Sequence, residues 1–322
     1  MVEVAAIDRE TLEIFERTVR GVLGPRVDVT GALRDVGWRD FLSADAASVV
    51  PLVFGVLGEL VLASTALDDV AFAALGPTGV ELRDAGHAFA HRPGAHPAVT
   101  STEDGFTIDA IVFGHRSAAP VTLVDGMRVL SVAGSSLEWR SVAGIDPALG
   151  LARVRGFVAI GAVEVHRAAD ADAGAVVPAC RRALAHELLG ATDAMLTMAT
   201  EYAKVRQQFG QPIGAFQAVK HRLADVYVAR QAAAAVVEES WRSDPACTTV
   251  AAKALAAHAG ALASEHCLQV LGAIGFTLEH DLQRFVRRVR VLDQLYGAQH
   301  ALRLELGRLL QARGRMPRPG AA

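Results

Sequence analysis

The spacing of hydrophobic residues divides the chain into three regions. Residues 8 to about 75, and again from about 178 onward, repeat apolar positions every three or four residues, as amphipathic helices do, whereas residues 78–168 alternate with a period of two. We therefore predict a mainly α fold with a small middle antiparallel β domain. The expected parts are an N-terminal helical domain at 1–77, the β domain at 78–170, a C-terminal helical bundle at 171–314 and a disordered tail at 315–322.

Strands are predicted at several places in the middle region. Phe106–Phe113 alternates apolar and polar side chains, and Arg153–Ile160 adds a strand of the same kind. Val121–Val124 and Met127–Val132 flank the dipeptide Asp125-Gly126. An Asp-Gly pair between two β-rich runs is a strong hairpin signal, so these two strands are expected to pair with each other.

The C-terminal region predicts an antiparallel bundle of long helices. Its first helix carries apolar residues at three- and four-residue steps between Leu184 and Tyr202. The later helices are expected at about 216–241, 246–271, from about 279 onward, and 299–313. Several of them would contain about 25 residues and extend roughly 40 Å, which are the proportions of a helical bundle.

Composition and charge narrow the functional classes. The 322 residues are 52% hydrophobic and 21% charged, which indicates a globular protein with two or three domains. The net charge of -3 and the dispersed Arg residues argue against a nucleic-acid-binding surface. Three widely separated Cys residues (Cys180, Cys247 and Cys267) predict neither a disulfide framework nor a zinc site. The N-terminus has no signal-peptide pattern, so we expect a cytoplasmic protein.

One segment imitates a membrane span. Residues 47–67 are nearly all apolar and are about long enough to cross a bilayer. Pro51 and Glu59 interrupt the segment, and neither end carries a cluster of basic residues or an aromatic belt. The buried central helix of an all-helical domain has the same composition, and we favour that interpretation over membrane association.

A compact polar turn joins the first two helices of the predicted bundle. Within Arg206–Gln217, Gly210 and Pro212 end one helical pattern, and Phe216 begins the next. An Arg, an aromatic ring and a Gln at one helix junction suit a ligand with phosphates and a flat ring, because a guanidinium matches phosphate oxygens. The alternative is a capped turn whose Arg only satisfies backbone carbonyls.

Several common motifs are missing from the sequence. No GxGxxG follows a predicted strand, and neither a P-loop nor a Gly-x-Ser-x-Gly elbow is found. His87 and His91 are four residues apart, but Ala88 stands where a zinc peptidase would have Glu. Gly86 and Pro93 place the two His residues in a loop or strand, so we expect no metal centre there.

Motifs in the C-terminal half resemble the acyl-CoA dehydrogenase family. The segment Gln269–Asp281 is similar to the family's Gly-Gly-x-Gly-Phe motif, and Leu33–Trp38 fits its N-terminal helices. The resemblance is strong from 180 to 300 and looser before that. The remaining positions that carry it are Tyr202, Arg206, Phe209-Gly210, Pro212-Ile213, Phe216-Gln217, Lys220 and Leu223-Ala224-Asp225.

The resemblance implies a fold, a cofactor and partners. The family has an N-terminal helical domain, a middle β domain and a C-terminal four-helix bundle, and it binds FAD between the subunits of a dimer, usually within a tetramer. By position, Arg206 and Gln217 would hold the pyrophosphate and adenosine of one FAD, and the turn at 269–273 would line the FAD bound with a neighbouring subunit. An acyl-CoA substrate and an electron-transfer flavoprotein as acceptor are implied as well. The residues assigned to FAD in this way are Arg206, Phe209, Gln217, Gln269, Gly272 and Ala273, of which Ala273 replaces the family's second Gly.

The resemblance also shows where a catalytic group is missing. Removing the α-proton of an acyl thioester, while a hydride leaves the β-carbon for the flavin, requires a positioned carboxylate base. The family places its catalytic Glu at one of two positions, which correspond to Tyr296 and Cys180 in this sequence. Neither side chain is a carboxylate, and both are poor bases at their ordinary pKa values. The loops that surround the flavin ring in the family are also missing between about Leu75 and Gly79.

Three hypotheses follow for the function. The chain is a subunit of a heteromeric acyl-CoA dehydrogenase whose partner subunit supplies the Glu, an arrangement that some actinobacterial members acting on CoA esters of steroid side chains resemble. Alternatively, it is a self-sufficient dehydrogenase that uses Asp293 or Glu187 as its base, or a helical scaffold without FAD. We favour the heteromeric subunit, because a scaffold has no use for Arg206, Gln217 and Gln269.

Overall fold

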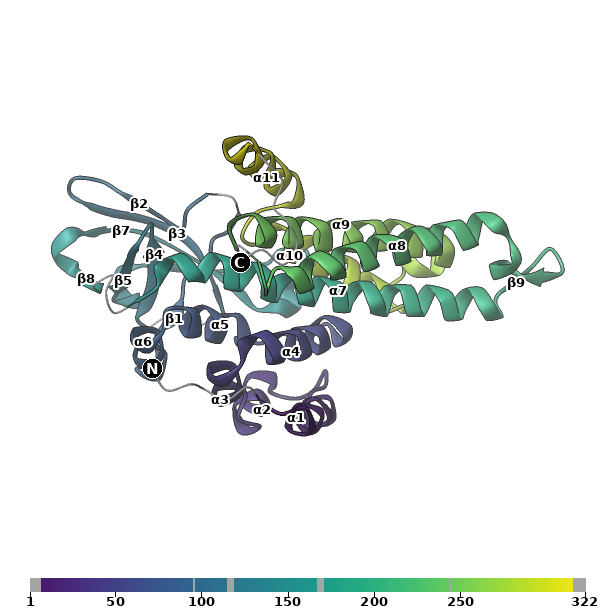
Figure 1. The fold of residues 1–322 in the computed structure, drawn as a ribbon, viewed down its shortest axis with the longest axis horizontal. Helices are drawn as coiled ribbons and strands as arrows, with labels where there is room; N and C mark the ends of the chain where they lie inside the picture. The colour runs from purple at the N-terminus through teal and green to yellow at the C-terminus, as the bar shows by residue number, and fades with distance from the viewer. Residues whose placement is uncertain (1–6, 95, 115–118, 167–170, 244, 315–322) are drawn as a thin grey trace. The chain divides into compact units, whose positions relative to one another are not determined.

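The chain folds into two structural units, each assembled from three separate stretches of sequence. Figure 1 labels the helices and strands. Unit 1 contains Met1–Val49, Ala63–Ala183 and Gln294–Ala298, and unit 2 contains Val50–Leu62, Leu184–Asp293 and Gln299–Ala322. The computed structural model describes residues 7–94, 96–114, 119–166, 171–243 and 245–314. The tail predicted to be disordered, 315–322, lies outside the described residues.

Short helices form the first part of unit 1 and confirm the helical prediction for residues 8–75. The first helix begins after Asp8, whose carboxylate accepts a hydrogen bond of 2.9 Å from the backbone N–H of Thr11 and so caps the helix. A helix also occupies residues 77–84, which the two-residue periodicity had assigned to the β region, because Pro77 is well suited to the first helical position. The helices are α1 (Arg9–Val22), α2 (Val29–Asp35), α3 (Trp38–Ala44), α4 (Ala46–Leu60), α5 (Ala66–Ala74) and α6 (Pro77–Asp84), of which α4 continues into unit 2.

Two four-stranded sheets make up the β part of unit 1 and share one hydrophobic core. Alternate residues of the long central strand, from Phe106 to Val112, lie in the same core cluster as Val121 and Leu123 of the other sheet, as in a β-sandwich. The first sheet has the order β1 (Ala88–Phe89), β4 (Val121–Asp125), β5 (Arg128–Val132), β8 (Val163–His166), and the second β2 (Val99–Ser101), β3 (Gly105–Phe113), β7 (Leu151–Ala159), β6 (Glu138–Ser141). Short 3-10 turns, η1 (Gly134–Ser136), η2 (Pro147–Leu149) and η3 (Ile160–Ala162), connect some of these strands.

The sheets confirm the predicted hairpin and add one parallel pair. Strands β4 and β5 are antiparallel with Asp125 opposite Arg128, so the turn residues are Gly126 and Met127, one position later than expected. Gly126 has a φ of 59°, which costs glycine little because it has no Cβ. Strand β1 pairs parallel with β4, so this sheet is mixed. A two-residue strand is too short for periodicity to reveal it or its direction.

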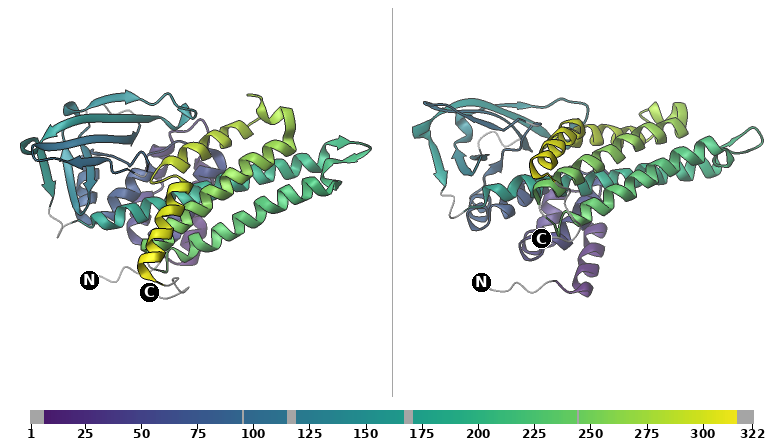
Figure 2. Two further views of the ribbon diagram at one scale, coloured as in Figure 1. Left: turned by 90° about the horizontal axis from the view of Figure 1, so that it is seen from above. Right: turned by 45° about the horizontal axis from the view of Figure 1, so that its top comes forward.

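Long helices dominate unit 2, and they match the predicted segments closely. Helices α8 and α9 run side by side (Figure 2), and the carbonyl of Arg222 lies 3.0 Å from His266 Nδ1 between them. The helices are α7 (Ala173–Val205), which begins in unit 1, α8 (Gln217–Glu239), α9 (Pro245–Leu271), α10 (Leu282–Gln294) and α11 (Gln299–Arg313). The remaining elements are the β9 (Gln207–Gln208) and β10 (Gln211–Pro212) hairpin, η4 (Ile213–Ala215) and η5 (Gly272–Phe276).

Among the described residues, one helical stretch is long and apolar enough to cross a membrane. This stretch is Pro245–Phe276, not the segment 47–67 that the sequence singled out, and 67% of its most apolar window is buried inside the protein. Helix α4, which covers most of 47–67, has 15 residues and is shorter than the roughly 20 residues that a span requires. Burial of this kind is typical of a core helix in a bundle.

Glycines allow two helices of unit 2 to approach closely. A Cβ on Gly190 of α7 would lie 2.2 Å from the carbonyl oxygen of Gly55 in α4, and a Cβ on Gly58 would lie 2.0 Å from the carbonyl oxygen of Glu187. These distances are far below van der Waals contact, and the neighbouring atoms are backbone. The crossing of α4 and α7 therefore requires glycine at both positions.

We predict that Gly190→Ala destabilises the protein, because the added methyl group forces two helices apart. The expected loss is about 1–3 kcal/mol, measured as a fall of the thermal midpoint. Gly307→Ala in α11 is the matched control, because a Cβ there meets no atom within 4 Å and alanine favours a helix. Equal midpoints for the two variants would contradict this account of the crossing.

Candidate functional site

The residues predicted to hold the pyrophosphate lie where α7 ends and α8 begins, in unit 2. Arg206 directly follows α7, and Gln217 is the first residue of α8. Between them, β9 and β10 form a hairpin whose turn residues, Phe209 and Gly210, have φ values of 51° and 79°. Positive φ at both turn positions is the geometry that tight hairpins require. Figure 1 shows this hairpin at the far end of α7 and α8.

These side chains are exposed and available to a ligand. Phe209 is 90% exposed, and Arg206 and Gln217 are exposed as well. Within the part of the chain that the structure describes, the side chains of Arg206 and Gln217 make no hydrogen bond or ion pair with the protein. The alternative in which Arg206 only caps the turn is therefore not what the structure shows, since its carbonyl, not its guanidinium, bonds Ile213.

The second predicted group lies at the end of α9. Gln269 occupies the last turn of this helix and is exposed, and Gly272 and Ala273 begin η5. Gly272 has a φ of 66°, a value that side chains other than glycine rarely adopt. Because α8 and α9 are antiparallel neighbours, Gln217 and Gln269 lie toward the same end of unit 2.

The two positions expected to hold a catalytic Glu meet inside unit 1. Cys180 of α7 is 0% exposed, Tyr296 is 2% exposed, and their side chains are hydrogen-bonded to each other. Burial raises the pKa of the Cys180 thiol to about 12. Burial also raises the pKa of the Tyr296 phenol well above its ordinary value, and the nearby Cys180 and Asp68 raise it further. Both groups are therefore neutral near pH 7, and neither can act as a base.

The sequence did not reveal the hydrogen-bonded chain that continues from Tyr296. Its hydroxyl lies 2.8 Å from Nδ1 of His91, and His91 Nε2 lies 2.7 Å from Oδ1 of Asp68 in α5. When Nε2 donates to the carboxylate and Nδ1 carries no proton, Nδ1 of His91 accepts a hydrogen bond from the phenol. His91, considered above as a metal ligand, is thus bonded to protein groups at both ring nitrogens. His87, the other candidate ligand, lies 3.0 Å from Thr122 Oγ1 through its Nδ1.

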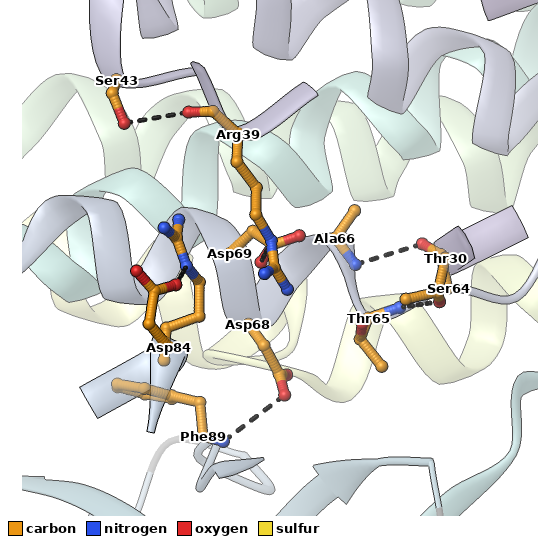
Figure 3. Close-up of polar contacts among 11 residues, drawn as sticks. Thr30, Arg39, Ser43, Ser64, Thr65, Ala66, Asp68, Asp69, Asp84 and Phe89 are labelled. Atoms are coloured by element: carbon orange, nitrogen blue, oxygen red, sulfur yellow. Dashed lines mark hydrogen bonds and ion pairs between the residues drawn. The ribbon is translucent and has the colours of Figure 1, made fainter. Parts of the chain in front are cut away.

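Asp68 and its neighbour Asp69 connect this chain of hydrogen bonds to the N-terminal helices (Figure 3). Asp68 points toward β1, where it also accepts a 3.4 Å hydrogen bond from the backbone N–H of Phe89. Asp69 accepts a 2.9 Å hydrogen bond from Nε of Arg39. Burial raises the pKa of Asp69, and Arg39 opposes this effect. Two adjacent acidic residues within an otherwise apolar helix were the signal that could have pointed to a buried polar network.

The carboxylates proposed as relocated bases have structural roles in unit 2. Glu187 is buried and forms an ion pair of 3.1 Å with Arg288 Nη1, which also donates a 2.6 Å hydrogen bond to the carbonyl of Leu62. Asp293 Oδ1 accepts a 2.8 Å hydrogen bond from the backbone N–H of Gln299, the first residue of α11. Glu187 thus serves as the counter-charge of a buried Arg, and Asp293 accepts a hydrogen bond at the start of a helix. The structure therefore gives both carboxylates protein partners, and the assignment of either one as a base stays a prediction.

A cavity of about 250 Å³ lies beside Tyr296 in unit 1. Its walls are mostly apolar, and the charged residue among them is Arg92. His91 and Cys180, which bond the Tyr296 hydroxyl, do not line it. Besides Tyr296 and Arg92, its lining includes Phe89, Ala98, Val124 and Val176.

Comparison with known proteins identifies relatives of this chain. Residues 177–310 match the family model of the acyl-CoA dehydrogenase C-terminal domain. The chain is 32% identical over 259 residues to the acyl-CoA dehydrogenase IpdE2 of Mycobacterium tuberculosis, and the match covers 78% of each chain. A match to IpdE2 of Mycolicibacterium smegmatis is 39% identical over 114 residues and covers 35% of this chain and 37% of the relative.

Solved structures share the fold at lower sequence identity. A chain of the ChsE4-ChsE5 complex from Mycobacterium tuberculosis superposes with a TM-score of 0.72 at 20% identity, and the match covers 99% of each chain. A chain of the Tcur3481-Tcur3483 steroid ACAD G363A variant gives a TM-score of 0.69 at 19% identity, with 98% of this chain and 91% of the other covered. The helical architecture with its small sheet region is thus that of this family's structures. Together with the similarity to IpdE2 over most of its length, this agreement shows that the chain belongs to the acyl-CoA dehydrogenase family.

Proposed function

We propose that the chain is an FAD-binding subunit of a heteromeric acyl-CoA dehydrogenase, in which a partner subunit supplies the catalytic Glu. The observation that carries this proposal is the state of the two base positions, where a thiol and a phenol are buried and bonded to each other. The side chains of the predicted flavin contacts Arg206, Gln217 and Gln269, in contrast, are exposed. A subunit that keeps flavin contacts but lacks the base is expected to complete its site with another chain.

The side chains at the α7–α8 junction fit an FAD pyrophosphate. Arg206 presents a guanidinium that can bind phosphate oxygens with two parallel hydrogen bonds. Helix α8 begins at Gln217, and its N-cap residue, Phe216, makes no side-chain capping bond, so backbone N–H groups at this helix N-terminus also favour an anion. Gln217 and Gln269 would bind the adenosine portion or a neighbouring ring edge through their amides. When bound, FAD would supply the acceptor for the hydride that leaves the acyl β-carbon.

The relatives support the heteromeric form of the proposal. Two of the structures with this fold, the ChsE4-ChsE5 complex and the Tcur3481-Tcur3483 steroid ACAD, are each named for two components. On this basis we propose a second acyl-CoA dehydrogenase chain as the partner and an acyl-CoA thioester, of a fatty acid or a steroid side chain, as the substrate. An electron-transfer flavoprotein as electron acceptor and a cytoplasmic location complete the proposal.

We predict that Arg206→Ala lowers flavin affinity, because it removes charge-assisted hydrogen bonds to phosphate. A loss of about 1.5–3 kcal/mol corresponds to roughly 10- to 150-fold weaker binding. The measurement is the flavin content of the complex, from its visible absorbance after purification and after titration with FAD. Arg290→Ala is the control, because Arg290 is also an exposed Arg of unit 2 but lies on α10, away from the α7–α8 junction. Unchanged flavin affinity in the Arg206 variant would refute the assigned role.

We also predict that the chain purified alone does not reduce a dye in the presence of acyl-CoA and FAD. Cys180 and Tyr296 cannot accept the α-proton, and Glu187 and Asp293 are held by structural partners. After co-expression with a second acyl-CoA dehydrogenase chain from the same genome, the complex is expected to show a flavin spectrum and turnover. Acyl-CoA-dependent dye reduction by this chain alone would instead establish a self-sufficient enzyme. A lack of flavin in both preparations would leave the scaffold hypothesis.

A further inference from the structure

Tyr296 has an unfavourable backbone conformation for a residue with a large side chain. Its φ is 57°, in the left-handed region where the Cβ of an L-residue comes too close to the backbone. Such a conformation persists when surrounding contacts hold it in place, and it is often found at functional positions. The contacts around Tyr296 therefore show what keeps it there.

Three parts of Tyr296 are held by other segments of unit 1. The backbone carbonyl accepts a 3.2 Å hydrogen bond from Nε of Arg181 in α7, and the backbone N–H points toward the carbonyl of Arg92 at 3.5 Å. The hydroxyl lies 2.8 Å from His91. Together these contacts fix the backbone and the ring of a residue that is 2% exposed.

His91 is itself held rigidly. It is 0% exposed, and its ring packs edge-on against Phe113 with centroids 5.2 Å apart and against the ring of Tyr296 at 5.8 Å. Asp68 orients the ring through Nε2 at a distance of 2.7 Å. Nε2 of His91 is bonded to Asp68, and its Nδ1 is bonded to the hydroxyl of Tyr296. Each of these buried groups therefore has a hydrogen-bond partner.

We propose that Asp68 and His91 form a clamp that holds Tyr296, and with it the segment 294–298, in this strained conformation. Tyr296 is then a structural residue that occupies the predicted base position with a neutral hydroxyl, and it takes no part in proton transfer. The cavity next to it supports this assignment, because Tyr296 lines the cavity while the partners of its hydroxyl do not. The stability test below is independent of the proposed function, and the activity test rests on it.

The test compares Tyr296→Phe with Tyr227→Phe in the full-length chain and in the complex with its partner. Removing the Tyr296 hydroxyl leaves Nδ1 of His91 buried without a donor, so the thermal midpoint of the chain is expected to fall by about 2–8 °C. Tyr227 is 54% exposed, and its hydroxyl accepts a hydrogen bond from Gln231, so its variant should change the midpoint by less than about 1 °C. Dehydrogenase activity of the assembled Tyr296→Phe complex should remain within about twofold of the wild type, since a proton-transfer role would cost about 100-fold or more.

Several outcomes would overturn the clamp. One is an unchanged midpoint for Tyr296→Phe, and another is loss of activity at an unchanged midpoint. If stability and activity fall together, the pH–rate profile decides: a limb that disappears with the hydroxyl shows that Tyr296 titrates in catalysis, whereas an unchanged profile supports the structural role. Asp68→Asn provides a second variant in which His91 is expected to lose part of its orientation, again with a lower midpoint.

The buried thiol and phenol also predict an alkaline limit to stability. The thiol of Cys180 ionises near its ordinary pKa of 9.0 in the unfolded chain but near 12 in the folded one, with Tyr296 and Asp68 facing it. Its contribution to stability is therefore complete below about pH 9 and is lost as pH rises from 9 to 12, with the unfolding equilibrium constant rising up to about tenfold per pH unit. Cys180→Ser should reduce this slope in urea unfolding measured from pH 8 to 11. Equal slopes for the variant and the wild type would show that Cys180 is not protected from ionisation.

Discussion

Burial at positions 180 and 296 is the constraint on which the functional interpretation depends. A group without access to water must be neutral or paired, and here a thiol, a phenol and a histidine are hydrogen-bonded in sequence, with the carboxyl group of Asp68 at the end. A carboxylate at either position would need to ionise in this environment to act as a base. The two positions where the resemblance implies a base thus hold buried groups that are neutral near pH 7.

The side chains predicted to contact the flavin, unlike the two positions expected to hold a base, are exposed. Arg206, Gln217 and Gln269 lie at helix ends in unit 2 and are exposed, where a phosphate and a ring can bind without displacing protein contacts. These predicted flavin contacts are thus accessible, whereas the two positions expected to hold a base are buried. The proposed heteromeric enzyme, in which one subunit contacts the flavin and another supplies the base, accounts for both features. A scaffold would account only for the buried base positions.

Acidic residues in this chain illustrate why sequence position is a weak guide to catalysis. Glu187 and Asp293 lie at helical spacings from the expected base positions, yet one neutralises a buried Arg288 and the other caps α11. Asp68 lay in an apolar helix and attracted no functional interpretation, yet it is the carboxylate that orients His91. Which role a carboxylate has depends on the cation or donor that the fold brings within hydrogen-bond distance.

The sequence alone determined the helices of the bundle to within a few residues, the β4–β5 hairpin and the family, because these depend on local periodicity, turn chemistry and short motifs. Through the family resemblance it also implied two positions for the base, Cys180 and Tyr296, neither of which is a carboxylate. The tertiary structure decided that these positions touch, that they are buried, and that His91 and Asp68 complete a chain in which directly bonded residues are up to 205 positions apart in the sequence. No local pattern encodes such contacts, since they arise where α5, the end of β1, α7 and the α10–α11 connection pack together in one unit. The short parallel pairing of β1 with β4 was hidden for the same reason, because a two-residue strand gains its direction from a partner more than 30 residues away.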